Sequence, residues 1–184
     1  MADVDLIETE LSSVAVFDGV LLNVRRDEVR TPSGATAVRE WIEHPGAAVV
    51  IARLDNGKLL FERQYRYALQ RIFIELPAGK IDRGEHALDT AKRELREETG
   101  YRASHWRHVG TMHPCIGYSN ERIEIFFAHG LSFVGNGLDV EEFLEVNEMS
   151  LIDAILAIRD GEITDAKTIT ALLWAEKIIS GDWL

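Results

Sequence analysis

The feature that most constrains this sequence is a set of acidic residues repeated at helical spacing. Residues 86–99 have a helix-forming composition, and Gly100 follows where a left-handed helix cap is expected. On this helix Glu94, Glu97 and Glu98 stand at positions i, i+3 and i+4, so their carboxylates share one face. A neighbouring apolar stripe can bury the helix against a core, and it consists of Leu88, Ala91 and Leu95.

This acidic face is unfavourable for the stability of the helix alone. Like charges at i, i+4 cost about 0.2–0.5 kcal/mol per pair, and carboxylates near a helix C-terminus oppose the helix dipole. A divalent cation would relieve the repulsion, and ligands that are all oxygen suit Mg²⁺ or Mn²⁺ better than zinc. The plainer interpretation is a solvated acidic face that Arg93 and Arg96 neutralise.

The residues around the acidic face favour the first interpretation. From Gly79 to Tyr101 the chain follows the pattern G-x5-E-x7-R-E-U-x-E-E-x-G-U, where U is a bulky and usually aliphatic residue. This stretch resembles the Nudix box, with Tyr101 a mild departure at the last position. The resemblance implies hydrolysis of a nucleoside diphosphate linked to a further group, with two to three Mg²⁺ or Mn²⁺ ions held on the helix.

The rest of the chain limits the class of protein. No apolar run approaches the ~18 residues of a membrane span, the N-terminus is acidic rather than like a signal peptide, and Cys115 is the single cysteine. We therefore expect a cytoplasmic protein that contacts no membrane. The net charge of −11 argues against binding to nucleic acid, which needs clustered Lys and Arg, but it leaves a phosphorylated small molecule open.

Residues 1–43 are expected to form a small subdomain. After a loose acidic arm at 1–10, the pattern predicts a hairpin with an Asp18-Gly19 turn and a third strand after a turn at 31–34. The expected antiparallel strands are 14–17, 20–29 and 36–42. Because three short strands have little core of their own, and because the Nudix resemblance implies it, we expect this sheet to form a homodimer.

Residues 44–184 are expected to form the hydrolase domain. The continuous apolar run at 47–52 is typical of a strand buried on both faces. Further strands are expected at 58–67, 71–76, 106–112, 122–129 and 143–149, a mobile loop at 130–141, and later helices at 151–159 and 166–179. This order predicts an α/β fold with a mixed sheet sandwiched between helices, which is the Nudix fold that the resemblance implies.

Segments outside the box narrow the resemblance. Residues 61–66, 74–80 and 39–46 are similar to the ADP-ribose pyrophosphatase branch of Nudix hydrolases, although 114–119 departs from the proline- and glycine-rich form of that branch. Hydrolases of GDP-mannose and other nucleoside diphosphosugars share these motifs, so this substrate class is the alternative. A non-catalytic nucleotide-sugar sensor is more remote, because every acid of the box is present and the chain has no basic helix.

The resemblance implies a role for each residue of the box. Glu94 and Glu98 correspond to the glutamates that ligate metal, and the carbonyl of Ala78 corresponds to a backbone ligand. Glu97 corresponds to the acid that bridges or orients the metal, so Glu97 and Glu98 are the expected catalytic acids of the helix. Two residues are expected to hold the helix and its carboxylates in place, and these are Glu85 and Arg93.

Residues outside the box are expected to bind the substrate and supply the general base. Arg66 lies at the position that contacts the pyrophosphate, where a planar guanidinium suits two phosphate oxygens. Glu142 corresponds to the loop acid that serves as metal ligand or base, with Glu141 as the alternative. The other expected substrate contacts are Arg39, Glu40 and Ser119. The implied reaction is in-line attack of water on ADP-ribose, which gives AMP and ribose 5-phosphate.

Overall fold

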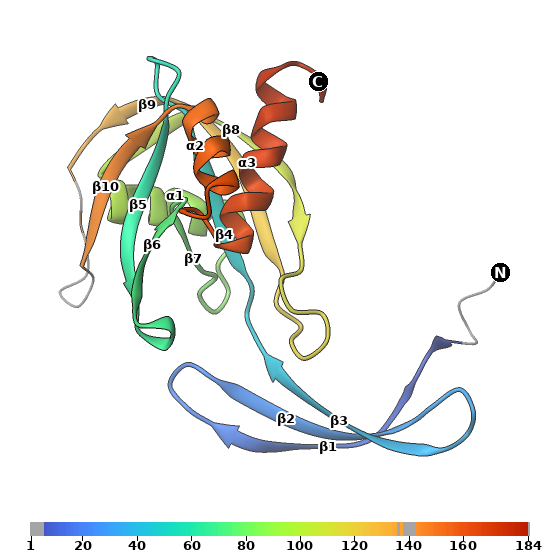
Figure 1. The fold of residues 1–184 in the computed structure, drawn as a ribbon. Coiled ribbons are helices and arrows are strands. Elements are labelled where there is room, and N and C mark those ends of the chain that lie inside the picture. Colours follow the sequence, from blue (N-terminus) through green and yellow to red (C-terminus); the bar gives the residue numbers. More distant parts are fainter. Residues whose placement is uncertain (1–5, 136, 138–142, 184) are drawn as a thin grey trace. The chain divides into compact units, whose positions relative to one another are not determined.

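A computed structural model of the chain describes residues 6–135, 137 and 143–183 (Figure 1). The chain divides into two compact units. The smaller unit comprises Met1–Pro45 and Cys115–Glu121, and the larger unit comprises Gly46–Pro114 and Arg122–Leu184. None of the helices in the described ranges is long and apolar enough to cross a membrane.

The smaller unit is built on an antiparallel sheet in the order β1-β2-β3. Its strands are β1 (Thr9–Asp18), β2 (Asn23–Arg30) and β3 (Thr36–Glu43). The turn at 31–34 is confirmed, since Gly34 donates its N–H to the carbonyl of Thr31. The predicted two-residue turn at Asp18-Gly19 is wrong, because the turn is longer and is closed by a hydrogen bond from the N–H of Gly19 to the carbonyl of Leu22. The arm is also shorter than predicted, because pairing with β2 starts β1 at Thr9.

The larger unit contains a mixed sheet and a second, antiparallel sheet. The mixed sheet has the order β7-β4-β9-β8, with β4 parallel to β9, and the second sheet has the order β10-β5-β6. The strands are β4 (Ala47–Ala52), β5 (Leu59–Arg66), β6 (Arg71–Glu75), β7 (Ala78–Lys80), β8 (Tyr101–Met112), β9 (Ile123–Phe133) and β10 (Leu144–Met149). The helices are α1 (Ala87–Thr99), α2 (Leu151–Arg159), α3 (Ala166–Ile179) and the 3₁₀ turn η2 (Tyr67–Leu69).

Strand β4 lies at the centre of this unit and is buried along its whole length. Alternate side chains of a strand point to opposite faces, so β4 contributes to two apolar clusters. Val49 and Ile51 pack in the cluster that includes α2 and α3, whereas Ala48 and Val50 pack in the cluster that includes α1 (Figure 1). The predicted α/β fold, with a mixed sheet between helices, is therefore confirmed.

Three boundaries in the larger unit differ from the prediction. The short strand β7 was not among the expected strands, but its residues pair with β4, with Ala48 opposite Gly79. Strand β8 begins at Tyr101, which lies opposite Phe133 of β9. Strand β9 therefore continues into the segment expected to be a loop, and Gly130 accommodates a positive φ of 68° within it. Long-range pairing outweighs the local signal of glycine at this position.

Candidate active site

Helix α1 begins one residue later than the predicted helix and ends at the predicted cap. His86 stands at the N-cap, and Gly100 ends the helix in the left-handed region at φ 77°, donating its N–H to the carbonyl of Arg96. The apolar stripe is buried, and the acidic residues beside it are largely shielded from solvent as well. Glu94 is 8% and Glu98 4% exposed. The helix therefore holds carboxylates at the edge of the core, where their charges require partners.

Strand β7 packs directly against the acidic side of α1. The backbone N–H of Ala78 donates to Oε2 of Glu98 at 3.1 Å. A Cβ atom placed on Gly79 would lie only 1.9 Å from Oε1 of Glu94, so a glycine is needed for this close approach. The structure thus brings together the backbone and the two carboxylates that the sequence analysis assigned to a metal site.

Arg93 links the acids of the box to one another. It donates to both oxygens of Glu85, at 3.1 and 3.0 Å, and its Nη1 donates to Glu94 at 2.7 Å and to Glu97 at 3.3 Å. These contacts hold the pKa of Glu85 down to about 2, mainly through the hydrogen bond from Arg93. The arginine also offsets part of the predicted like-charge repulsion, and it fixes three carboxylates around one guanidinium.

The donor atoms on this side of α1 fit a hard divalent cation. Glu94 and Glu98 offer carboxylate oxygens beside β7, and oxygen is the ligand that Mg²⁺ and Mn²⁺ prefer. Across the described ranges, however, no three acidic, histidine or cysteine side chains are already arranged around a common metal position. Glu94 and Glu97 both accept from Arg93, so a cation would have to replace the arginine at these oxygens.

A buried carboxyl group that the sequence analysis did not identify lies nearby. Glu62 is 0% exposed, and neither of its oxygens has a hydrogen-bond partner within the described part of the chain. It follows Leu60 by two residues on β5, and Leu60 packs in the same cluster as α1. Burial, and then the charge of Glu75, raise the pKa of Glu62 to about 8, although Lys167, Glu98 and Arg66 act in the opposite direction.

The signal for Glu62 in the sequence is weak. Glu62 directly follows three buried apolar residues, Leu59 to Phe61, on strand β5. From the sequence alone, a glutamate at this point would ordinarily indicate that the strand has reached solvent. A buried carboxyl whose pKa is raised needs a proton or a cation to neutralise it. It therefore supports the fit of this region to a positively charged ligand.

Arg66 is held in place by a second buried acid that the sequence analysis did not single out. Its Nε and Nη2 donate to the two oxygens of Glu75 at 2.7 and 2.8 Å, and Lys167 also contacts Glu75. Burial works against ionisation of Glu75, but the two cations outweigh it and lower its pKa. The fork of Arg66 is thus oriented on one side, and neither of these bonds uses its Nη1.

The remaining predicted residues belong to the smaller unit or fall outside the described residues. Arg39, Glu40 and Ser119 belong to the smaller unit. Arg39 forms an ion pair with Glu8, Glu40 is exposed on β3, and the hydroxyl of Ser119 donates to the carbonyl of Ile42 at 3.3 Å. The predicted base Glu142 and its alternative Glu141 lie outside the described residues. The roles of all these residues in catalysis and substrate binding stay predictions.

Comparison with known proteins identifies the family. The model of the NUDIX domain matches residues 35–172. An ADP-ribose pyrophosphatase of Bacillus subtilis (strain 168) is 36% identical over 93% of this chain and 94% of its own, and one of Mycobacterium tuberculosis is 34% identical over 93% and 84%. A solved structure described as an ADP compounds hydrolase superposes with a TM-score of 0.85 at 22% identity, covering 97% of both chains. With the box residues gathered on α1 and β7 of this fold, the chain belongs to the NUDIX domain family and is a Nudix hydrolase.

Proposed function

We propose that this protein hydrolyses the pyrophosphate bond of ADP-ribose, with Mg²⁺ or Mn²⁺, to give AMP and ribose 5-phosphate. The observation that carries the proposal is the packing of β7 on α1, where the backbone of Ala78 meets the carboxylate of Glu98 and Gly79 makes room for Glu94. The choice of ADP-ribose is supported by the names of two relatives that align with nearly the whole chain.

In this proposal Glu94, Glu98 and the carbonyl of Ala78 hold the divalent cations, and Glu97 joins them once Arg93 has released it. Bound there, the cations supply positive charge to the phosphate oxygens and lower the pKa of the attacking water. Arg93 keeps Glu85 as its partner through two hydrogen bonds, so it can release Glu94 and Glu97 without losing its own position. Glu85 and Arg93 thereby act as supports for the carboxylates.

The diphosphate is bound by Arg66. Glu75 fixes the guanidinium through two bonds, which lowers the entropy cost of placing its remaining donors on phosphate oxygens. Glu142 takes the proton of the attacking water, with Glu141 as the alternative base. This loop carboxylate would supply the general base, a group that the box itself does not provide.

The smaller unit is proposed to dimerise the protein and to bring Arg39, Glu40 and Ser119 to the substrate. Several large apolar side chains of β1 and of the β1–β2 turn are exposed, which supports an interface there. They are Leu11, Val14, Val16, Phe17, Val20 and Leu21. The proposal also places the enzyme in the cytoplasm, where the single Cys115 would remain a thiol.

A substrate panel tests the proposed function. Purified protein with Mg²⁺ is incubated separately with ADP-ribose, GDP-mannose and ADP-glucose, and nucleotide products are separated and quantified. We expect ADP-ribose to have the highest kcat/KM and AMP to form in equal amount to ribose 5-phosphate. A higher kcat/KM for GDP-mannose would identify that nucleotide sugar as the preferred substrate. No turnover of any of the three would contradict the proposed hydrolase activity.

A further inference from the structure

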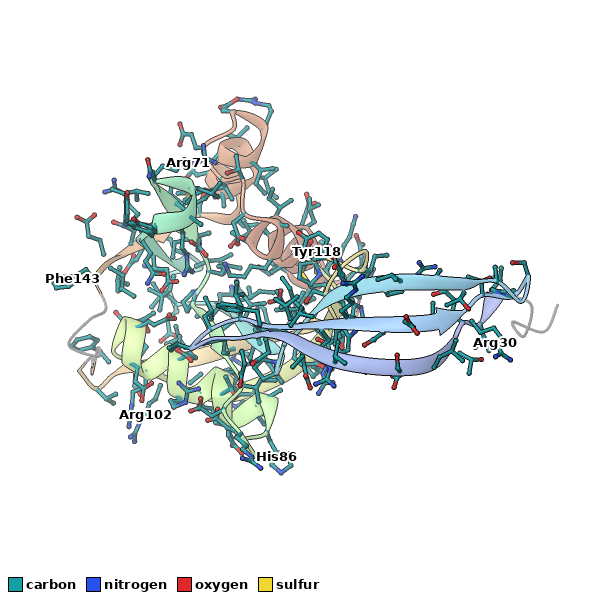
Figure 2. The ribbon with its side chains drawn as sticks, turned by 90° about the horizontal axis from the view of Figure 1, so that it is seen from below. Arg30, Arg71, His86, Arg102, Tyr118 and Phe143 are labelled. Carbon is teal, nitrogen blue, oxygen red and sulfur yellow. The ribbon has the colours of Figure 1, made fainter. Side chains whose placement is uncertain are left out.

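A cavity of about 420 Å³ lies in the larger unit on the outer side of α1, where the helix meets β8. Four of its lining residues are basic, namely Lys92, Arg93, Arg96 and Arg102, and the others are the acidic Glu97 and the apolar Ala103 and Trp106. Lys92 and Arg96 stand on the flank of the helix away from Glu94 and Glu98, because of their helical spacing. Figure 2 shows Arg102 just beyond the C-terminal end of α1, with His86 at the opposite end. The cavity shares Arg93 and Glu97 with the box network, but neither Glu94 nor Glu98 lines it.

The basic residues of the cavity are only partly neutralised. Arg102 has no ion pair within the described ranges, and the contact of Lys92 with Asp89, at 3.6 Å, is an exposed pair of little strength. Arg96 binds Glu97 at 2.9 Å, but Glu97 also accepts from Arg93. Arg93 is neutralised by the acids of the box, but Lys92, Arg96 and Arg102 have only Asp89 and Glu97 as ion-pair partners among the described residues, which leaves a local excess of positive charge in a protein whose net charge is −11.

The indole of Trp106 gives the cavity a fixed apolar wall. Its Nε1 donates to the carbonyl of Ala103 at 3.1 Å, and its ring meets Phe126 edge to face, with centroids 6.5 Å apart. The indole N–H is thus already used, so Trp106 offers the cavity an apolar ring rather than a hydrogen-bond donor. A planar aromatic ligand can stack on such a surface, and a base stacks regardless of its identity.

We propose that this cavity binds a nucleoside monophosphate, with its phosphate on Arg96 and Arg102 and its base against Trp106. Its volume lies within the range of about 300–1,000 Å³ that is usual for small-ligand sites. Two guanidinium groups favour a phosphate over a simple halide ion, because each can offer paired donors to its oxygens. The inference does not depend on which nucleotide sugar the enzyme hydrolyses.

The first test locates binding with AMP as the probe, in EDTA so that cations do not draw the nucleotide to the acidic site. The chain has four tryptophans, whose indole N–H signals can be followed by NMR in ¹⁵N-labelled protein, with the signal of Trp106 assigned from Trp106→Phe. We expect AMP to shift the Trp106 signal in a saturable manner and to leave the others nearly unchanged. No saturable shift of that signal would overturn the proposal.

Variants identify the groups that bind AMP. We expect Arg102→Ala and Arg96→Ala each to weaken binding about tenfold, as loss of a charged hydrogen bond does. The matched control is Arg159→Ala, because Arg159 is exposed on α2 and pairs only with its neighbour Asp160 in the described part of the chain. An equal effect of this control would show non-specific attraction and contradict the site.

Two further arms separate this cavity from the proposed active site. Arg66→Ala should leave the AMP-induced shift of Trp106 intact, and Arg102→Ala should leave hydrolysis unchanged. If Arg66→Ala abolishes binding and Arg102→Ala does not, AMP occupies only the hydrolytic site and the proposal is wrong. Ribose 5-phosphate should bind more weakly than AMP, and equal binding would remove the role of Trp106. A failure of hydrolysis in wild-type protein would remove only the hydrolysis arm and would leave every binding readout as it stands.

Discussion

Gly79 of β7 and Glu94 of α1 approach so closely that a methyl group on Gly79 would overlap the carboxylate. A Cβ atom on Gly79 would stand 1.9 Å from Oε1 of Glu94 and 2.1 Å from its Cδ. The atoms that it would meet belong to the end of a flexible side chain, so they can move away at modest cost. The position of Glu94, rather than the fold, therefore depends on this glycine.

Gly79→Ala is expected to displace Glu94 while leaving the protein folded. We predict a free energy of unfolding within about 1 kcal/mol of wild type, and an affinity for Mn²⁺ reduced about tenfold to a hundredfold, as for losses of groups that orient metal ligands. Isothermal titration with Mn²⁺ and urea denaturation measure the two quantities. Gly117→Ala is the matched control, since a Cβ there meets nothing within 4 Å. Unchanged Mn²⁺ affinity in Gly79→Ala would show that Glu94 is not a ligand.

Glu62→Gln is expected to stabilise the metal-free protein at alkaline pH. The pKa of Glu62 is raised to about 8 from its ordinary value of 4.5, so the folded state binds a proton more tightly than the unfolded state. The stabilising effect of that proton is complete below pH ~4.5 and is lost as the pH rises through ~8. Glutamine stays neutral, so the variant should match wild type at pH 4.5 and exceed it by about 2–5 kcal/mol at pH 9.

Urea denaturation in EDTA at these two pH values measures that difference. If the difference in free energy of unfolding between variant and wild type is the same at both pH values, Glu62 is ionised at both and has a cationic partner. The comparison uses metal-free protein because a bound cation would add its own free energy to that of the folded state.

Arg66→Lys is expected to lower kcat/KM for ADP-ribose about tenfold to a hundredfold, because an ammonium group cannot reproduce the forked contact with Glu75 and still reach the phosphate. Steady-state kinetics with Mg²⁺ measures the effect. Arg63→Lys serves as the control, since Arg63 lies on the same strand but is exposed and pairs with Glu145 at 2.7 Å. Comparable losses in both variants would argue against a specific role of Arg66.

Val16→Glu is expected to convert the proposed dimer to a monomer, because it places a charge among the exposed apolar side chains of β1. Light scattering coupled to size exclusion measures the mass, and Ser12→Glu is a control that adds the same charge to the same strand. A monomeric mass for the wild type at working concentration would contradict the dimer directly.

The sequence predicted the elements whose signals are local. The apolar run of β4, the cap at Gly100 and the helices at 151–159 and 166–179 all appear where they were expected, because each depends on residues close to it in the chain. The arrangement of the box acids on one helix was predicted for the same reason. These features follow from periodicity and capping without reference to distant contacts.

What the sequence could not predict depends on residues that are far apart along the chain. The short β7 exists because it pairs with β4, and Glu62 is buried because β5 carries it toward α1. Glu75 likewise becomes important only through Arg66 and Lys167, the latter 92 residues away. Patterns of neighbouring residues in the sequence do not contain this information. The contact of Glu75 with Arg66 and the burial of Glu62 are therefore seen only in the folded structure.

The central claim is that the carboxylates of α1 hold the cations for pyrophosphate hydrolysis, and Glu98→Gln tests it most directly. We predict that AMP formation from ADP-ribose in Mg²⁺ falls at least a hundredfold, because losing a metal ligand costs several kcal/mol of barrier. Asp89→Asn, on the exposed side of the same helix, should keep wild-type turnover. If Glu98→Gln hydrolyses ADP-ribose within about tenfold of wild type, the account of this site is contradicted.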